Sequence, residues 1–244
     1  MLMILMYSLI SLVFSEFESI LPDFKIQKFN IERNGRDIDI TIVKINPDKY
    51  KMEIYHNDDK NLTIKDIAIR EGYVLLFNSG MFDVDYKSSM GFLKSKGNIL
   101  NSKNHPQYLS VIAFDPIRTD YPNFYMYDLE SISIDSINSM YGSVIQNLRL
   151  IKRPRENRWP KQSKEWMELA IGQDTSNNIL LIYCHSYISM HELNEVLLGL
   201  PIDLQVAQHL EGNLVAQFYL STDSMQVDYD YGHYVPNLIG FKIK

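Results

Sequence analysis

Apolar and polar residues alternate along several short segments of the chain, with the two-residue period of half-buried β-strands. The clearest are residues 24–32 (FKIQKFNIE) and 37–45 (DIDITIVKI). Asn34-Gly35 between them is a strong signal for a tight hairpin. Shorter apolar runs predict further strands at residues 51–56, 73–78, 108–116, 123–129, 143–151, 167–172, 178–186, 203–210 and 214–220.

Two segments instead predict short helices. In residues 61–70, Thr63 and Asp66 have the spacing of a capping box. In residues 189–200, Ser189 and Glu192 have the same spacing, and Gly199 and Pro201 end the apolar face that follows. Because the strands are not regularly separated by helices, we predict an α+β fold of largely antiparallel sheets with a few short helices, as a single domain over residues 16–244.

The N-terminal segment is apolar and carries no charged side chain from Leu2 to Phe14. A membrane span needs about 20 apolar residues, so these 13 favour a leader over residues 1–15 that is cleaved near Ser15. An uncleaved anchor and a buried first element remain alternatives. The leader predicts an exported protein, periplasmic or secreted, with no stable membrane span after its removal.

Composition narrows the possible partners. The 244 residues, 45% of them hydrophobic, can form a sizeable core, and a formal charge of −6 gives no electrostatic basis for binding nucleic acid. Cys184 is the one cysteine, so no intramolecular disulfide can form, and its apolar setting predicts a buried strand. The histidines lack the spacing of zinc ligands; we predict no resident metal site and no cofactor, while a loosely held divalent ion at acidic loops stays open.

Two turns at strand ends carry candidate chemistry. The first, NSGMFDVD, follows the apolar run that ends at Phe77, and the second, EGN, follows the run that ends at Leu210. Loops over a rigid sheet often hold functional groups. Locally, however, both sequences are also ordinary turns, so neither identifies a site by itself.

Longer segments around these two turns resemble those of a known family. The segment from Trp166 to Tyr219 resembles the C-terminal half of the phosphodiester glycosidase domain family, in which LLLLFCRSPYSMHDF and LEGGPEASLY correspond to LLIYCHSYISMHEL and LEGNLVAQFY here. Upstream and downstream, FNSGMF, MGFL, LSVIAFDP, IQNLRLI and VPNLIGF resemble further family segments in the same order. The resemblance therefore covers nearly the whole chain after the leader.

The resemblance implies a site formed by two distant parts of the chain. It marks Asn78, Gly80, Met81, Gln146, Glu211 and Gly212, with Asn213 at the position of a second glycine. Cleaving a sugar from a phosphodiester needs a carboxylate near the anomeric carbon, for which Glu211 is the first candidate and Asp83 the second. Asn78 and Gln146 would donate hydrogen bonds to the substrate, and His185 would bind phosphate when protonated.

Two functions follow from this comparison. The first is an exported hydrolase that cleaves a sugar-phosphate phosphodiester or a related envelope glycan linkage. The second is a non-catalytic envelope protein that binds a glycan, because Asn213, Val215, Gln217 and His185 replace a glycine, an acid, a serine and an arginine of the family pattern.

Overall fold

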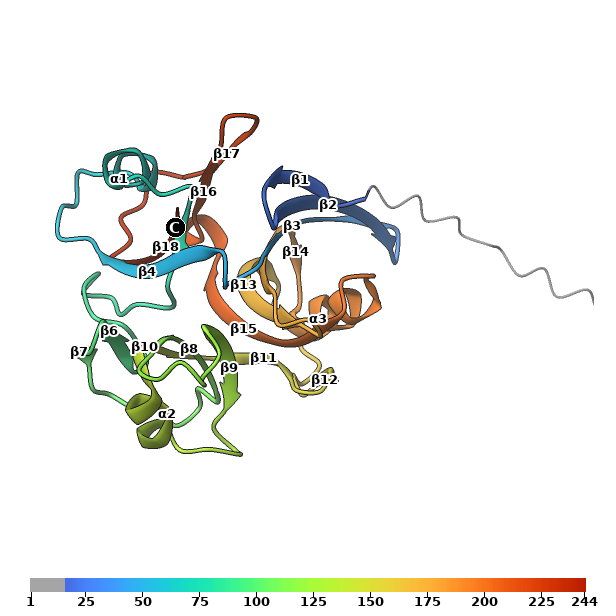
Figure 1. Cartoon of the computed structure of the whole chain (residues 1–244). Helices are drawn as coiled ribbons and strands as arrows, with labels where there is room; N and C mark the ends of the chain where they lie inside the picture. The colour runs from blue at the N-terminus through green and yellow to red at the C-terminus, as the bar shows by residue number, and fades with distance from the viewer. Residues whose placement is uncertain (1–15) are drawn as a thin grey trace, which may run out of the picture.

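Three antiparallel β-sheets form the body of the protein (Figure 1). The structure, a computed structural model, describes residues 16–244. The largest sheet has eight strands in the order β1 (Glu18–Leu21), β2 (Phe24–Arg33), β3 (Arg36–Ile45), β14 (Ile179–Ile188), β13 (Trp166–Asp174), β15 (Leu204–Gly212), β11 (Arg149–Lys152) and β12 (Glu156–Asn157). The predicted hairpin at Asn34-Gly35 joins β2 to β3.

The two remaining sheets have five strands each. One has the order β7 (Asn98–Asn101), β6 (Leu93–Ser95), β10 (Tyr141–Asn147), β8 (Ser110–Pro116) and β9 (Phe124–Asp128). The other has the order β17 (Gln226–Tyr229), β16 (Phe218–Ser221), β5 (Leu75–Asn78), β18 (Asn237–Ile243) and β4 (Tyr50–His56). The prediction of a single α+β domain with largely antiparallel sheets is confirmed.

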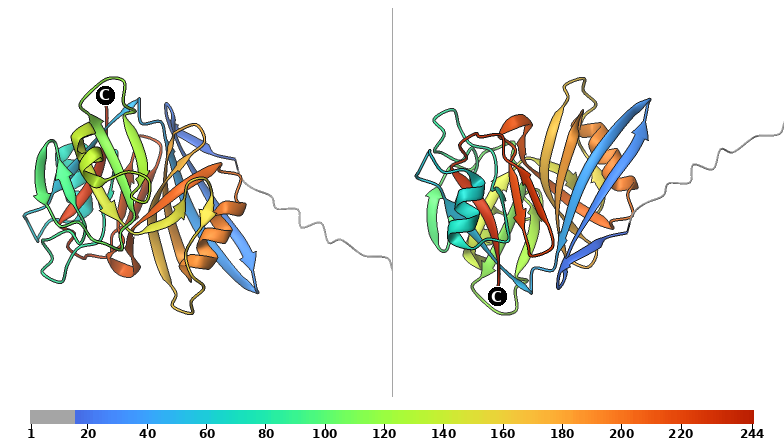
Figure 2. Two further views of the ribbon diagram at one scale, coloured as in Figure 1. Left: turned by 90° about the horizontal axis from the view of Figure 1, so that it is seen from below. Right: turned by 90° about the horizontal axis from the view of Figure 1, so that it is seen from above.

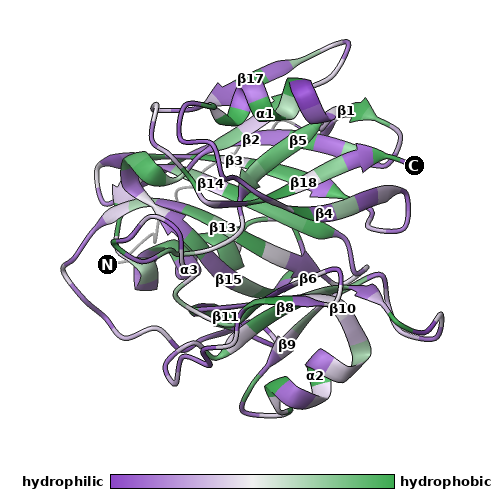
Figure 3. Ribbon diagram, turned by 90° about the vertical axis from the view of Figure 1, so that its left-hand side faces the viewer, coloured by the Kyte–Doolittle hydropathy of each residue, from purple (hydrophilic) through white to green (hydrophobic). Residues whose placement is uncertain are grey.

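The inner faces of all three sheets meet in one hydrophobic core. Tyr183 on β14, Phe77 on β5 and Ile112 on β8 belong to the same buried cluster, although they come from three different sheets. Figure 2 shows the eight-stranded sheet lying beside the two smaller ones, and Figure 3 shows apolar segments along the strands that face this core. The shared core makes the three sheets one folding unit.

Short helices cover the outer faces of the sheets. α3 (Met190–Gly199) packs on the eight-stranded sheet, α1 (Ile64–Glu71) on the sheet that contains β5, and α2 (Ile134–Met140) beside β8 and β10. The capping box of Thr63 and Asp66 is confirmed in both directions. The Ser189 hydroxyl accepts a hydrogen bond from the Glu192 N–H, but the Glu192 carboxylate pairs with Arg33 and Arg36 on the neighbouring hairpin.

Several boundaries differ from the sequence-based expectation. The strand predicted over residues 143–151 is divided at Leu148, where the chain leaves β10 in one sheet and enters β11 in another. The strand predicted to begin at residue 214 begins at Phe218, because residues Asn213–Val215 form a 3₁₀ turn, η1. Helix α2 was not predicted; it has only seven residues, and its apolar face consists of Ile134, Ile137 and Met140.

The expected position of Cys184 is confirmed, since this free cysteine is buried on β14. None of the helices within residues 16–244 has the length and apolar character needed to cross a membrane. The predicted leader, residues 1–15, lies outside the described residues.

Candidate functional site

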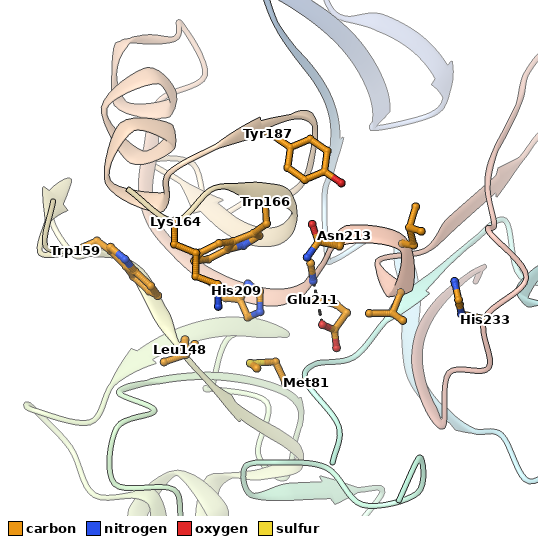
Figure 4. Close-up of a pocket in the computed structure, with 13 residues that line it drawn as sticks. Met81, Leu148, Trp159, Lys164, Trp166, Tyr187, His209, Glu211, Asn213 and His233 are labelled. Carbon is orange, nitrogen blue, oxygen red and sulfur yellow. Dashed lines mark hydrogen bonds between the residues drawn. The ribbon is translucent and has the colours of Figure 1, made fainter. Parts of the chain in front are cut away.

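A cavity of about 580 Å³ opens at the end of β15, beside the start of β13 (Figure 4). Its walls come from five parts of the chain that are far apart in sequence. The lining residues are Met81, Leu148, Trp159, Lys164, Trp166, Tyr187, His209, Glu211, Gly212, Asn213, Leu214, Val215 and His233. Of the predicted site residues, the structure thus brings Met81 together with Glu211, Gly212 and Asn213.

A β-bulge shapes the end of β15. Leu169 on β13 pairs with Glu211, whereas the next residue, Ala170, pairs with His209, so Leu210 is an extra residue in β15. Bulges interrupt the regular alternation of side chains and re-aim them, often beside functional sites. His209 and Glu211, on either side of the extra residue, both line the cavity.

Glu211 is the carboxyl group of this cavity. Its Oε1 accepts a hydrogen bond of 3.0 Å from the Gly212 N–H. Burial raises the pKa of Glu211 to about 7, and the charge of Glu168 adds to the rise, while His209 and the Gly212 N–H oppose it. Near neutral pH, Glu211 is therefore available both as an acid and as a carboxylate.

A buried ion pair stands directly behind Glu211. His209 Nδ1 lies 2.6 Å from Oε1 of Glu168, whose side chain is wholly buried, and the Trp166 indole N–H donates a 2.8 Å hydrogen bond to the other carboxylate oxygen. Burial alone would lower the pKa of His209, but the Glu168 carboxylate and, less strongly, Glu211 raise it. The pair therefore favours a protonated imidazole at the cavity wall.

The sequence-based search missed this pair. Glu168 and His209 lie 41 positions apart, on the strands β13 and β15. A charged residue inside each of two strands predicted to be buried is an available signal, because buried charges are normally paired. Which partner each charge finds depends on strand order and register, which one sequence does not fix.

Asn78 links the first predicted turn to the second. Its side chain is fully buried; Oδ1 accepts a 2.6 Å hydrogen bond from the Gln217 N–H, and Nδ2 donates a 3.0 Å bond to the Val215 carbonyl. The two turns predicted to converge therefore do meet. In this structure, however, the Asn78 amide holds the backbone after η1 and does not line the cavity.

The Gln146 amide is likewise hydrogen-bonded to other groups of the protein. Its Nε2 donates to Asn104 Oδ1 and to the carbonyls of His105 and Tyr108, at 2.7, 3.0 and 2.8 Å. Its Oε1 accepts from the N–H groups of Phe92 and His105. This side chain organises residues 104–108 and is not among the cavity-lining residues.

Met81 links residues 104–108 to the cavity, and Gly80 precedes it in the same turn. The Tyr108 hydroxyl lies 3.4 Å from the Met81 sulfur, which lines the cavity. A side chain at position 80 would not fit, because a Cβ atom on Gly80 would lie 2.9 Å from Nδ2 of Asn147. Gly80 thus lets the first turn pack closely against β10.

Asp83 and His185 lie outside the cavity lining. Asp83 accepts a 2.7 Å hydrogen bond from the Val84 N–H in an exposed turn. His185 Nε2 lies 3.0 Å from the Thr41 hydroxyl, and its ring packs beside Tyr183 and Tyr229. Burial lowers the pKa of His185, so the structure does not favour the protonated form in which it would bind phosphate.

Two of the four departures from the family pattern, Asn213 and Gln217, have structural explanations. Asn213 has a φ of 55°, a left-handed conformation that asparagine tolerates better than most residues. A Cβ atom on Gly212 would lie 2.9 Å from the Trp166 ring, so glycine permits this close contact. The Gln217 side chain donates a 2.6 Å hydrogen bond to the His233 carbonyl and so connects η1 to the segment that carries His233.

The ionic character of the cavity is mixed. Lys164, His209 and His233 could contact an anion, and Glu211 could contact a developing cation. Across residues 16–244, no three His, Cys, Asp or Glu side chains form a group that could hold a metal ion.

The family model described as phosphodiester glycosidase matches residues 71–242. A search of curated protein sequences gave no match.

Solved structures share the fold. A hypothetical protein from Synechocystis superposes with a TM-score of 0.69 at 12% identity over 91% of this chain, which spans 62% of that protein. The catalytic domain of zebrafish N-acetylglucosamine-1-phosphodiester alpha-N-acetylglucosaminidase, auto-inhibited by its pro-peptide, gives 0.67 at 12% identity over 95% of this chain and 87% of its own. A Burkholderia pseudomallei protein for which export is proposed gives 0.54 at 10% identity, over 84% and 74% of the two chains.

Proposed function

Because the chain belongs to the phosphodiester glycosidase family, we propose that it hydrolyses the bond between a sugar and a phosphodiester. One observation carries the proposal: the half-buried carboxyl of Glu211 lies in a large cavity beside the Glu168–His209 ion pair. The substrate would be a sugar phosphodiester or a related envelope glycan.

The bond that breaks joins the anomeric carbon to a phosphate oxygen. Positive charge develops on the sugar ring as the phosphate departs, and the ionised Glu211 carboxylate stabilises that charge or attacks the carbon. Water supplies the hydroxyl of the released sugar and the remaining proton, so the products are a free sugar and a phosphate monoester. Phosphate is a good leaving group, so one carboxylate and suitably placed donors are sufficient.

His209 acts on the departing phosphate. Its imidazolium donates a hydrogen bond to the oxygen that gains negative charge, and this bond strengthens in the transition state. Glu168 is a positioning residue, because it fixes the ring and keeps it protonated. Activity then needs Glu211 ionised and His209 protonated, which gives a bell-shaped dependence of rate on pH.

The remaining predicted residues divide into two groups. Met81, Gly212 and Asn213 line the cavity and would contact substrate. Asn78, Gly80 and Gln146 would support the site from behind, through the contacts described above. Asp83 and His185 take no part in the proposed reaction.

The protein would act outside the cytoplasm. Residues 2–14 have the length and composition of a secretory leader, and export is also proposed for one of the structurally similar proteins. Sequencing the N-terminus of the protein recovered from its host tests this, with a mature start near Glu16 expected and an intact Met1 counting against it.

The activity can be tested by incubating the purified chain with a panel of sugar-1-phosphodiesters and detecting free sugar by mass spectrometry. Glu211→Gln keeps the shape of the side chain but removes its charge, and we expect it to lower kcat/KM by at least about 10³-fold. Equal turnover by this variant would remove Glu211 from the mechanism.

A glycan-binding protein without catalysis is the second candidate. Val215, an apolar residue in the cavity wall, stands where the family pattern has an acid, so one charge is missing from the site. This candidate predicts no turnover of any sugar phosphodiester together with a rise in thermal stability when a glycan ligand is added.

A further inference from the structure

Most of the surface that lines the cavity is apolar. Four lining residues are aliphatic: Met81, Leu148, Leu214 and Val215. Three more are aromatic: Trp159, Trp166 and Tyr187. Figure 4 shows Trp159 and Leu148 on one side of the cavity, with His209 and Trp166 between them and Glu211.

The aromatic part of this wall is held in place by polar residues beneath it. The backbone N–H of Trp159, at the base of its ring, donates a 3.2 Å bond to Oδ1 of Asn157, and the same oxygen accepts a 3.0 Å bond from the side chain of Asn194, which is fully buried on α3. The Trp166 indole is fixed by its bond to Glu168. Rings held before a ligand arrives lose little conformational entropy on binding it.

The apolar wall continues to the protein surface. Tyr187 is 58% exposed and Leu214 is 49% exposed, and both line the cavity. These two side chains extend the lining of the cavity to the solvent. The cavity therefore has a polar centre at Glu211 and His209 and an apolar path leading outward.

One cation on this path lacks a carboxylate partner. The Lys164 Nζ lies 5.4 Å from the centre of the Trp166 ring. Among the described side chains, none of the carboxylates lies within ion-pair distance of Lys164. The ammonium is therefore available to an anionic group bound between the polar centre and the aromatic wall.

These features indicate the chemistry of the group attached to the phosphate. Sugar hydroxyls that are buried against leucine, methionine and valine would lose hydrogen bonds to water without replacing them. An alkyl or aryl group loses nothing there and gains from burial. Resting on the proposed function, we propose that the substrate is a glycosyl phosphate esterified to a hydrophobic alcohol, whose chain lies along Trp159, Trp166 and Leu214.

The test uses ligands without a sugar, so that it does not depend on turnover. Methyl phosphate and hexyl phosphate carry the same anionic group and differ by five methylenes, each of which contributes roughly a fourfold gain in affinity when fully buried. Calorimetric titration of the full chain should show hexyl phosphate binding at least about tenfold more tightly than methyl phosphate. Equal affinities would overturn the proposal.

Three variants locate the effect. Trp159→Ala and Leu214→Ala should each reduce the hexyl-to-methyl preference at least about threefold. Leu214 is exposed on η1, so its replacement remains informative if Trp159→Ala does not fold. Ile69→Ala removes a side chain that is 65% exposed on α1, away from the cavity lining, and should leave the preference unchanged. A preference that neither cavity variant reduces would place the chain elsewhere and contradict the proposal.

Matched sugar phosphodiesters with methyl and hexyl groups then separate the two proposals. Turnover with no chain-length preference would keep the proposed hydrolase and refute the hydrophobic alcohol. A hexyl preference in binding without turnover of either ester would keep the hydrophobic subsite and refute the hydrolase.

Discussion

The two turns that form the site use their polar residues in opposite ways. Asn78 in the first turn has both ends of its amide bonded to backbone groups of another segment. Glu211 at the end of β15 is half-buried, and among residues 16–244 its side chain accepts one hydrogen bond, from the neighbouring Gly212 N–H. The first arrangement stabilises the fold, whereas the second leaves an acid whose burial is poorly compensated and whose pKa is about 7.

This comparison shows why residues from one predicted site need separate tests. A polar side chain whose donors and acceptors are all bonded to other protein groups stabilises the fold, so its removal lowers the free energy of unfolding. A polar side chain that is removed from water without enough hydrogen-bond partners destabilises the fold. Proteins retain such groups where function needs them. Four predictions examine this difference, from the largest expected effect to the smallest.

Among these four predictions, the Glu168–His209 pair should give the largest effect on activity. Glu168→Gln keeps a hydrogen-bond acceptor near Trp166 and His209 but removes the negative charge, so the pKa of His209 should fall. We expect kcat/KM at neutral pH to decrease about 10²-fold and the alkaline limb of the pH profile to move to lower pH.

The shift of the alkaline limb distinguishes positioning from a purely structural role. Glu165→Gln is the matched control, since Glu165 lies three residues away on the surface and pairs with Arg36. An unchanged pH profile in Glu168→Gln would show that Glu168 does not control the protonation of His209.

Glu211 should make stability depend on pH. Its pKa rises from 4.5 to about 7 on folding, so the folded state holds the proton more tightly than the unfolded state. The contribution to stability is present below pH 4.5 and is lost as pH rises towards 7, by up to about 3 kcal/mol. The variant Glu211→Gln is neutral at every pH and should therefore be more stable than the parent near pH 7.

Urea unfolding of both proteins between pH 4.5 and pH 8 measures this difference. We expect the parent and Glu211→Gln to differ least at the acidic end and most at the alkaline end. A difference that stays constant with pH would contradict the raised pKa. If Glu211→Gln is more stable than the parent and has also lost activity, Glu211 is retained for function and not for stability.

Asn78 should show the reverse behaviour. Asn78→Ala leaves the Gln217 N–H and the Val215 carbonyl without their buried partner, which should lower the free energy of unfolding by about 2 kcal/mol. Asn61→Ala, which removes an exposed side chain bonded within its own turn, should change it by less than about 0.5 kcal/mol. A fully stable Asn78→Ala protein that has lost activity would instead assign Asn78 a direct contact with substrate.

The same distinction explains how far sequence reasoning reached. Most of the longer strands, α1 and α3 follow from local periodicity and capping, which act over a few residues. The convergence of Asn78 with the segment after Glu211 came from the family resemblance, and the structure shows the two turns in contact. The pairing of Glu168 with His209, the bulge at Leu210 and the division of one apolar run at Leu148 depend on strand register across three sheets, which no local pattern encodes.

Asp83 provides the smallest expected effect and the last test of the comparison. It stands two residues after the Met81 that lines the cavity, so a shift of this turn on substrate binding would be needed to bring its carboxylate to the reacting carbon. Asp83→Asn keeps the acceptor for the Val84 N–H, and we expect kcat/KM to change less than about twofold and stability by less than about 0.5 kcal/mol. A loss of 10²-fold or more would show that the turn after β5 contributes a charge to the reaction. The turn would then not serve only to support the reactive end of β15.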